Sequence, residues 1–173
     1  MTRKEQILGA ASRLLVEQGH AELSMRKLAD VLGIRASSLY KHVRGKDEVV
    51  AGLQERALRS LGQALSRAQP GVRSLGEAYR GWALANPAEY NLFTRIPLHR
   101  DLLAPGAEEA ATAPVLAAVA GDQDRARVLW ALAHGLVDLE LAGRFPPDAD
   151  IDAAWRTAVA LFEQGQPTPA DHS

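Results

Sequence analysis

The sequence predicts an all-α fold of about nine helices, divided into an N-terminal three-helix domain with a helix-turn-helix and a larger C-terminal helical domain. Two patterns lead to this prediction. Apolar residues recur at the three- and four-residue spacing of helices, with glycines and prolines between the segments. Hardly any stretch alternates apolar and polar residues as a strand would. We place residues 1–46 in the first domain and residues 47–173 in the second.

The first predicted helix begins near the N-terminus and ends at Gly19. Thr2 and Glu5 stand at the spacing of a capping box, in which two side chains cap free backbone amides at the helix start. Gly19 follows the last apolar position, where a glycine commonly ends a helix. The apolar face of this helix is expected at Ile7, Leu8, Ala11, Leu14 and Leu15.

Two short helices follow, with a glycine between them. Ser24 can cap the first of these with its hydroxyl, and Gly33 ends that helix and opens a tight turn. The next helix is predicted at about residues 36–42, with Leu39 and Val43 facing inward. A helix, a glycine-containing turn and a second short helix form the helix-turn-helix of DNA-binding proteins, in which the second helix enters the major groove.

The chain after this motif is predicted to be helical, with one long interruption. A long helix at about residues 46–68 starts with acidic side chains, which suit the helix dipole. A helix at about residues 72–86 follows, and Pro87 suits the first turn of the next helix. We expect a loop over residues 95–114 that leads into a helix at about residues 113–120.

The last two predicted helices, at about residues 124–143 and 150–164, differ in their apolar patterns. The first is apolar around much of its circumference and needs more than one packing partner, whereas the second carries one clean apolar stripe. Two such helices from each of two chains can form a four-helix dimer interface. Alternatively, both are core helices of a monomer. The expected interface residues are Leu129, Leu132, Leu136, Leu139, Trp155, Ala158, Val159 and Phe162.

Charge is distributed unevenly along a chain whose formal net charge is -1. Residues 1–60 hold eleven Lys and Arg against seven Asp and Glu, whereas the remaining residues are acidic overall. A basic segment on an acidic body is typical of a polyanion-binding module, although chance variation of surface charge gives the same contrast. The sequence starts without the apolar core of a signal peptide and has no apolar run that could span a bilayer, so we expect a soluble cytoplasmic protein.

The residue inventory argues against several kinds of chemistry. Without cysteine there are no disulfides, thiolate metal sites or cysteine nucleophiles. No metalloprotease, phosphate-loop or dinucleotide-binding motif is present, and the five histidines are scattered. We therefore expect no enzymatic activity, no metal and no cofactor.

Residues 7–53 resemble the DNA-binding domain of the TetR family of bacterial transcriptional regulators. Three segments carry the resemblance together: "A..L..E.G", "LS.RKLAD.LG" and "SLYKHV..KDE". Further on, "YRGWALANPAEYNLF" and "LWALAHGLVDLELAGRF" look more loosely like one type of TetR-family C-terminal domain. The resemblance implies a homodimer that binds a palindromic DNA operator. It also implies a C-terminal ligand-binding and dimerisation domain, in which a small-molecule effector releases the DNA.

The resemblance also assigns DNA contacts by position. The residues so assigned are Ser24, Arg26, Arg35, Ala36, Ser37, Ser38, Tyr40, Lys41, His42 and Lys46. Ser24 would hold a phosphate, or serve only as a helix cap, and Arg26 would reach a base edge. The segment from Arg35 to Ser38 would read bases, since Arg bonds guanine and an alanine methyl touches thymine. The remaining residues, Tyr40, Lys41, His42 and Lys46, would bind backbone phosphates. Such contacts position the protein without reading sequence.

Arg35 departs from the family pattern, which has Ser at this position. The substitution removes an expected helix cap and adds a potential guanine reader, although Arg35 can equally contact a phosphate. For Tyr40 the alternative is packing against its own domain, and for His42 it is simple exposure to solvent.

Aromatic and polar side chains of the C-terminal domain are candidates to line a ligand pocket: Tyr79, Trp82, Tyr90, Phe93, Arg95, His99, Trp130 and His134. Core packing is the alternative for each of them, and His134 also suits a dimer interface. Three functions therefore stay open: a ligand-responsive repressor, a helical binding protein or enzyme with a degenerate DNA-binding domain, and a regulator without a ligand.

Overall fold

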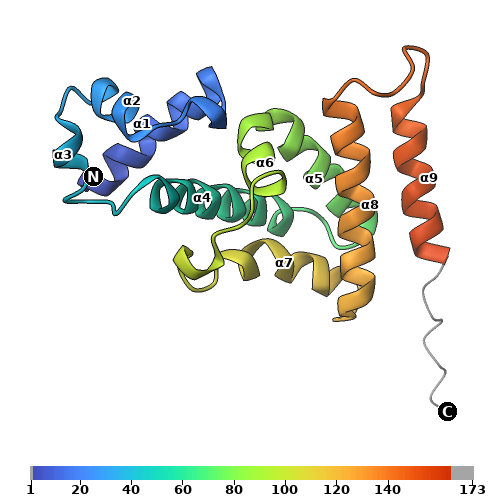
Figure 1. The fold of residues 1–173 in the computed structure, drawn as a ribbon. Helices are drawn as coiled ribbons and strands as arrows, with labels where there is room; N and C mark the ends of the chain where they lie inside the picture. Colours follow the sequence, from blue (N-terminus) through green and yellow to red (C-terminus); the bar gives the residue numbers. More distant parts are fainter. Residues whose placement is uncertain (1, 165–173) are drawn as a thin grey trace. The chain divides into compact units, whose positions relative to one another are not determined.

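The computed structural model describes residues 2–164, and within this range the chain is helical (Figure 1). These residues form nine α-helices and two short 3-10 helices, with no strand among them. The all-α prediction is therefore confirmed. None of the described helices combines the length and apolar character that crossing a membrane requires.

Packing divides the chain into two compact units, and the first runs to Gln63 and also includes Ala85–Ala111. This unit holds α1 (Arg3–Gln18), η1 (His20–Glu22), α2 (Met25–Val31), α3 (Ala36–Leu39), most of α4 (Lys46–Ser66), α6 (Pro87–Thr94), η2 (Arg100–Leu102) and the start of α7 (Ala107–Ala118). The helix-turn-helix thus shares a unit with α6, although α5 separates them in sequence. The functional boundary expected at residue 46 stays a prediction.

The start of α1 has the expected capping box. The Thr2 hydroxyl accepts a hydrogen bond from the Glu5 amide at 3.1 Å, and the Glu5 carboxylate accepts one from the Thr2 amide. Gly19 ends the helix with φ of 79°, a conformation that glycine adopts without strain. The sequence signals at both ends of α1 therefore operate as predicted.

One apolar core joins the DNA-binding helices to α6. Leu28 of α2 and Leu39 of α3 are 1% and 0% exposed, and they share this core with Ile7 of α1. Leu92 of α6, 1% exposed, belongs to the same cluster. Since burying a side chain of this size contributes about 1.5–3 kcal/mol, burial alone fixes α6 to the helices that hold the DNA-binding motif.

A buried glutamine makes a second connection between α4 and the segment around α6. Gln54 is 0% exposed, and its side-chain amide donates to the carbonyl oxygens of Leu92 at 3.2 Å and Pro97 at 3.1 Å. Its side-chain oxygen accepts a hydrogen bond from the His99 amide at 3.2 Å. All three bonds end on backbone groups, so Gln54 fixes the chain path from α6 into the following turn.

The predicted extent of α7 was wrong. We expected a loop to residue 114, but η2 interrupts this loop and α7 runs from Ala107 to Ala118 with Pro114 inside it. Proline has no amide hydrogen, so the carbonyl of Ala110 loses its usual donor four residues later. That carbonyl faces Gly62 of α4, where an added Cβ would lie 2.6 Å from the Ala110 carbonyl carbon. The two helices approach closely there because residue 62 has no side chain.

The second unit joins Ala64–Leu84 to the chain from Thr112 onward. It holds nearly all of α5 (Val72–Ala85), the rest of α7, α8 (Gln123–Leu141) and α9 (Ile151–Gln164). Arg80 of α5 ties the three longer helices together, because it donates to Glu140 of α8 at 2.7 and 2.9 Å and to Asp152 of α9 at 2.5 Å. α8 and α9 also pack on each other directly.

Candidate nucleic-acid interface

Helices α2 and α3 form the predicted helix-turn-helix, and they pack on each other. Gly33, with φ of 64°, ends α2, and the Ile34 amide then donates to the Ala29 carbonyl at 3.0 Å. α3 is shorter than expected, since it ends at Leu39 and the residues through His42 form a turn. Buried Leu39 and Val43 hold this turn on the core, so the side chains between them point away from it.

The residues predicted to contact DNA lie largely on the surface of this motif. Tyr40 is 56% exposed, which makes it one of the large apolar side chains that the first unit leaves open to solvent. Ser38 and Lys46 are half-buried, and the exposed members of the set are Ser24, Arg26, Arg35, Ala36, Ser37, Tyr40, Lys41 and His42. The surface that they form includes both the start of α3 and the turn after it.

Internal ion pairs separate the cations of this region into two groups. Lys4 pairs with Glu48 at 2.7 Å, Arg44 lies 3.9 Å from the same carboxylate, and Lys27 pairs with Glu22. Hydrogen bonds from Lys4 and from the Arg44 amide lower the pKa of Glu48, so this carboxylate stays charged. Within the described part of the chain, no carboxylate pairs with the other basic side chains: Arg26, Arg35, Lys41, His42 and Lys46. The charge of the two arginines and the two lysines among them is available to an external anion.

Ser24 and Arg35 begin the two helices of the motif in different ways. The Ser24 hydroxyl accepts from the Lys27 amide at 3.2 Å and remains exposed, so the cap and a phosphate contact are compatible. Arg35 occupies the cap position of α3 without making a side-chain cap, as its substitution for Ser predicted. Its guanidinium is therefore left unused by the helix start.

His20, just before α2, lies close enough to Lys46 for their charges to interact. Its pKa is lowered, first by burial and then by the positive charges of Lys46 and His99. At neutral pH the imidazole is therefore held in its uncharged form, and Lys46 is the cation that this corner presents.

The residues predicted to bind a ligand fall into both compact units. Tyr90, Phe93, Arg95 and His99 belong to the first unit, whereas Tyr79, Trp82, Trp130 and His134 belong to the second. Tyr90 is fully buried and meets the Phe93 ring edge-on at 5.9 Å. In the second unit, Tyr79 and Trp130 line a small apolar pocket of about 30 Å³ together with Leu65, Leu75, Gly76, Val115, Leu129 and Ala133. The Trp130 ring also stacks on His134 at 5.3 Å.

The predicted dimer residues divide by exposure. Leu132 and Leu139 of α8 are 37% and 44% exposed. Leu136 and Phe162 are half-buried, and the remaining members, Leu129, Trp155, Ala158 and Val159, are buried within the second unit itself. The interface stays a prediction, but the buried side chains already have packing partners in their own chain.

Two features escaped the sequence analysis. Gln54 interrupts the apolar stripe of α4, and a polar residue at such a position was the available signal for its buried hydrogen bonds. Arg73, Glu77 and Arg80 form a charged stripe on α5 at i, i+4 and i+7, and they line a groove against α9. Among residues 2–164, no three metal-ligating side chains gather as they would around an ion.

A helix-turn-helix with an exposed set of unpaired cations, carried on an all-helical chain, defines a DNA-binding transcriptional regulator. Family models agree: residues 7–53 match the model "Bacterial regulatory proteins, tetR family", and residues 72–162 match "Tetracyclin repressor-like, C-terminal domain". The chain belongs to the TetR family of transcriptional regulators.

One relative supports the same assignment, and two solved structures show the same fold. The HTH-type transcriptional regulator Rv0681 of Mycobacterium tuberculosis is 30% identical over 98% of this chain and 84% of its own length. The crystal structure of the putative regulatory protein SCO4313 has the same fold, with a TM-score of 0.76, 23% identity, and coverage of 92% of this chain and 94% of that one. The crystal structure of the multidrug binding protein EbrR complexed with imidazole matches with a TM-score of 0.73 and 24% identity. The match covers 100% of this chain and 99% of that one.

Proposed function

We propose that this regulator is a repressor that binds a palindromic operator as a homodimer and is released by a small-molecule effector. The observation that carries the DNA-binding part is the set of exposed cations around α3 that no internal carboxylate neutralises. A protein that leaves these charges open while pairing Lys4, Lys27 and Arg44 has a surface suited to phosphates.

The proposed contacts differ in what they contribute. Tyr40, Lys41, His42 and Lys46 bind backbone phosphates and set the position of the protein on the duplex. The start of α3 then reaches the base edges, where exposed Arg35 is the side chain best suited to a guanine. Replacing Arg35 therefore changes which operator is preferred, whereas replacing a phosphate contact weakens binding to every sequence.

Binding to the DNA upstream of the protein's own gene tests this proposal, measured by fluorescence anisotropy over a range of salt concentrations. A homodimer loses this charge-assisted contact twice, so Lys46→Ala is expected to weaken binding about a hundredfold and to reduce the salt slope by about two. Arg127→Ala is the matched control, because Arg127 is an exposed arginine of α8 that pairs with Asp124. Equal affinities of Lys46→Ala and the control, or no binding of the unmodified protein at low salt, would contradict the proposal.

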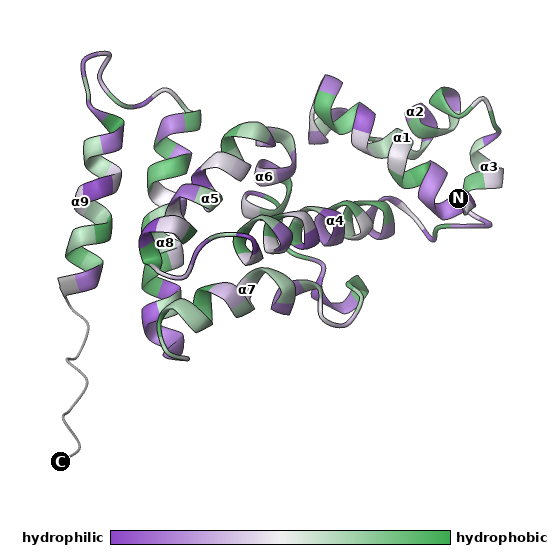
Figure 2. Ribbon diagram, turned by 180° about the vertical axis from the view of Figure 1, so that it is seen from behind, coloured by the Kyte–Doolittle hydropathy of each residue, from purple (hydrophilic) through white to green (hydrophobic). Residues whose placement is uncertain are grey.

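The homodimer is supported by an exposed apolar seam on α8. Val128, Leu132 and Leu139 are 59%, 37% and 44% exposed, and together with Gly135 they follow the spacing i, i+4, i+7 and i+11 along one helix face. Hydrophobic residues recur along the whole of α8 (Figure 2). On α9, Leu161 is 65% exposed. A monomer leaves these side chains in water, whereas a second copy covers them by a twofold contact.

Analytical ultracentrifugation tests the dimer. Leu132→Glu and Leu139→Glu place charges in the seam and are expected to shift the protein to monomers, with loss of operator affinity, because two half-sites require two linked motifs. Leu84→Glu is the control, since Leu84 is 39% exposed on α5, outside the seam. A protein that stays dimeric after both seam substitutions would exclude this interface.

For release by an effector, the candidate site is the apolar pocket of the second unit. The apolar pocket beside Tyr79 and Trp130 has only about 30 Å³, roughly the volume of one water molecule. An effector that binds there must widen it, and thereby couple its binding to a rearrangement of α5 and α8. The same small volume favours the alternative of a regulator without a ligand. A panel of apolar compounds that raises the melting temperature and lowers operator affinity would separate the two.

A further inference from the structure

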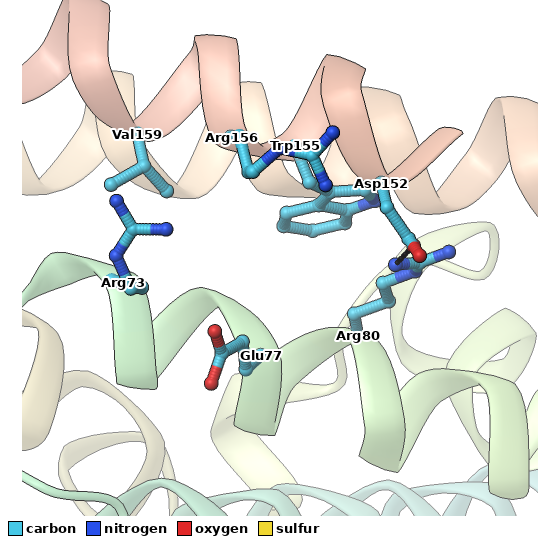
Figure 3. A pocket seen from close by; sticks show the side chains of 7 residues that line it. All are labelled: Arg73, Glu77, Arg80, Asp152, Trp155, Arg156 and Val159. Atoms are coloured by element: carbon cyan, nitrogen blue, oxygen red, sulfur yellow. Dashed lines mark hydrogen bonds and ion pairs between the residues drawn. The ribbon is translucent and has the colours of Figure 1, made fainter. Parts of the chain in front are cut away.

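A groove between α5 and α9 in the second unit shares no lining residue with the small apolar pocket just described. Its volume is about 330 Å³, at the lower end of the range of roughly 300–1,000 Å³ for small-molecule sites. The lining residues are Arg73, Glu77 and Arg80 of α5 and Asp152, Trp155, Arg156 and Val159 of α9 (Figure 3). None of them is among the residues from which the sequence predicted ligand binding.

The apolar surface of the groove is formed by two largely buried side chains of α9. Trp155 is 8% exposed, and a Cβ added at Gly76 of α5 would lie 3.5 Å from its ring, in ordinary contact. Val159, one turn further along α9, is 7% exposed. The indole Nε1 is buried and has no hydrogen-bond partner among the described residues. An aromatic ring and a branched side chain thus form an apolar wall beside the charged residues of α5.

Internal ion pairs engage the charged side chains at one end of the groove. The guanidinium of Arg80 bonds Glu140 and Asp152, and it lies 5.7 Å from the centre of the Trp155 ring. These bonds lower the pKa of Asp152 and raise that of Arg80, so both stay charged and paired. Arg156 lies 3.3 Å from Asp150. Three carboxylates are therefore engaged with two arginines, and this end is structural.

Arg73 and Glu77 are different, because neither has a partner within the described part of the chain. They stand four residues apart on α5, a spacing at which opposite charges commonly pair. Here they remain separate, with the Arg73 guanidinium directed toward α9 near Val159 and the Glu77 carboxylate between Arg73 and Arg80 (Figure 3). The groove therefore presents one open cation and one open anion beside the apolar wall.

We propose that this groove binds a small zwitterion, namely a free α-amino acid with a branched or aromatic side chain. Its carboxylate bonds Arg73, its ammonium bonds Glu77, and its side chain packs on Trp155 and Val159. The Glu77 carboxylate would repel a ligand that carries only a carboxylate, and the Arg73 guanidinium would repel a ligand that carries only a cation. A zwitterion pairs with both side chains. The proposal concerns binding and does not require that the amino acid release DNA.

Isothermal titration calorimetry of the full chain tests the proposal with L-leucine and L-phenylalanine, each beside its amide and its N-acetyl derivative. The amide lacks the carboxylate and the N-acetyl form lacks the ammonium, so each is expected to bind about tenfold more weakly than the free amino acid. Arg73→Gln is expected to remove the preference over the amide, and Glu77→Gln the preference over the N-acetyl form. Arg127→Gln, on an exposed part of α8, is expected to change neither.

The two substitutions alter exposed side chains, so the variants are expected to remain folded, which circular dichroism checks. Three results would overturn it: no saturable binding of either amino acid up to about 10 mM, equal binding of the derivatives, or unchanged binding by the Arg73→Gln and Glu77→Gln proteins. Operator binding is measured separately, so failure here leaves the DNA-binding proposal untouched.

Discussion

Replacing Gln54 with leucine removes the three hydrogen bonds that connect α4 to α6 and the turn after it. The side chain keeps a similar volume, so the expected loss comes from the bonds and from the backbone groups of Leu92, Pro97 and His99 that they satisfied. Each bond contributes about 0.5–1.5 kcal/mol, and the gain from a more apolar side chain offsets part of the loss. We expect a decrease of about 2–3 kcal/mol in the free energy of unfolding.

Urea unfolding followed by circular dichroism measures this change, and a drop of about 4–12 °C in melting temperature should accompany it. Gln63→Leu is the matched control, because Gln63 lies on the same helix and is exposed. Gln54→Glu should be worse than Gln54→Leu, since a buried carboxylate can neither donate to the two carbonyls nor keep its charge without cost. If the free energy of unfolding of Gln54→Leu stays within about 0.5 kcal/mol of that of the unmodified protein, the three hydrogen bonds contribute less to stability than this reasoning requires.

Two further predictions concern packing and pH. Gly62→Ala places a methyl group against the Ala110 carbonyl and should destabilise the fold by about 1–3 kcal/mol. Gly9→Ala places its methyl group in open space on α1 and should stabilise the fold by about 0.5–1 kcal/mol. Equal melting temperatures of the two variants would refute this contrast. The lowered pKa of Glu48 means that its pairing with Lys4 stabilises the fold above the ordinary value of 4.5 and is lost as pH falls below it. The Glu48→Gln variant should therefore be less stable than the unmodified protein at pH 7. Its stability should then fall less than that of the unmodified protein as the pH is lowered.

The position of α6 bears on how an effector signal would reach the DNA-binding motif. Leu92 lies in the same core as Leu39, and Gln54 adds hydrogen bonds from α4 to the same segment. A close-packed core transmits a displacement because it cannot absorb it. Any ligand that moves α6 therefore also acts on the helix-turn-helix, whichever residues bind the ligand.

Sequence reasoning was accurate where the signal is local. The capping box of Thr2 and Glu5, the cap at Ser24 and the start of α6 at Pro87 each depend on residues a few positions apart, and the structure has all of them. The same reasoning failed at α7, because the expected loop over residues 95–114 includes the first half of this helix, and Pro114 lies inside it. Tertiary contacts hold that helix around its proline, and no short-range pattern records them.

The sequence by itself determined the helical fold, the helix-turn-helix and the family, because these follow from apolar spacing, helix ends and a contiguous motif. Only the tertiary structure decided which charges are free. Lys46 and Arg73 have no ion-pair partner among the described residues, whereas Glu48 and Asp152 are engaged by Lys4 and Arg80. It also showed that Trp155 and Val159 pack within their own chain and line a groove. Such facts depend on the relative placement of distant helices, which the spacing within one helix does not contain.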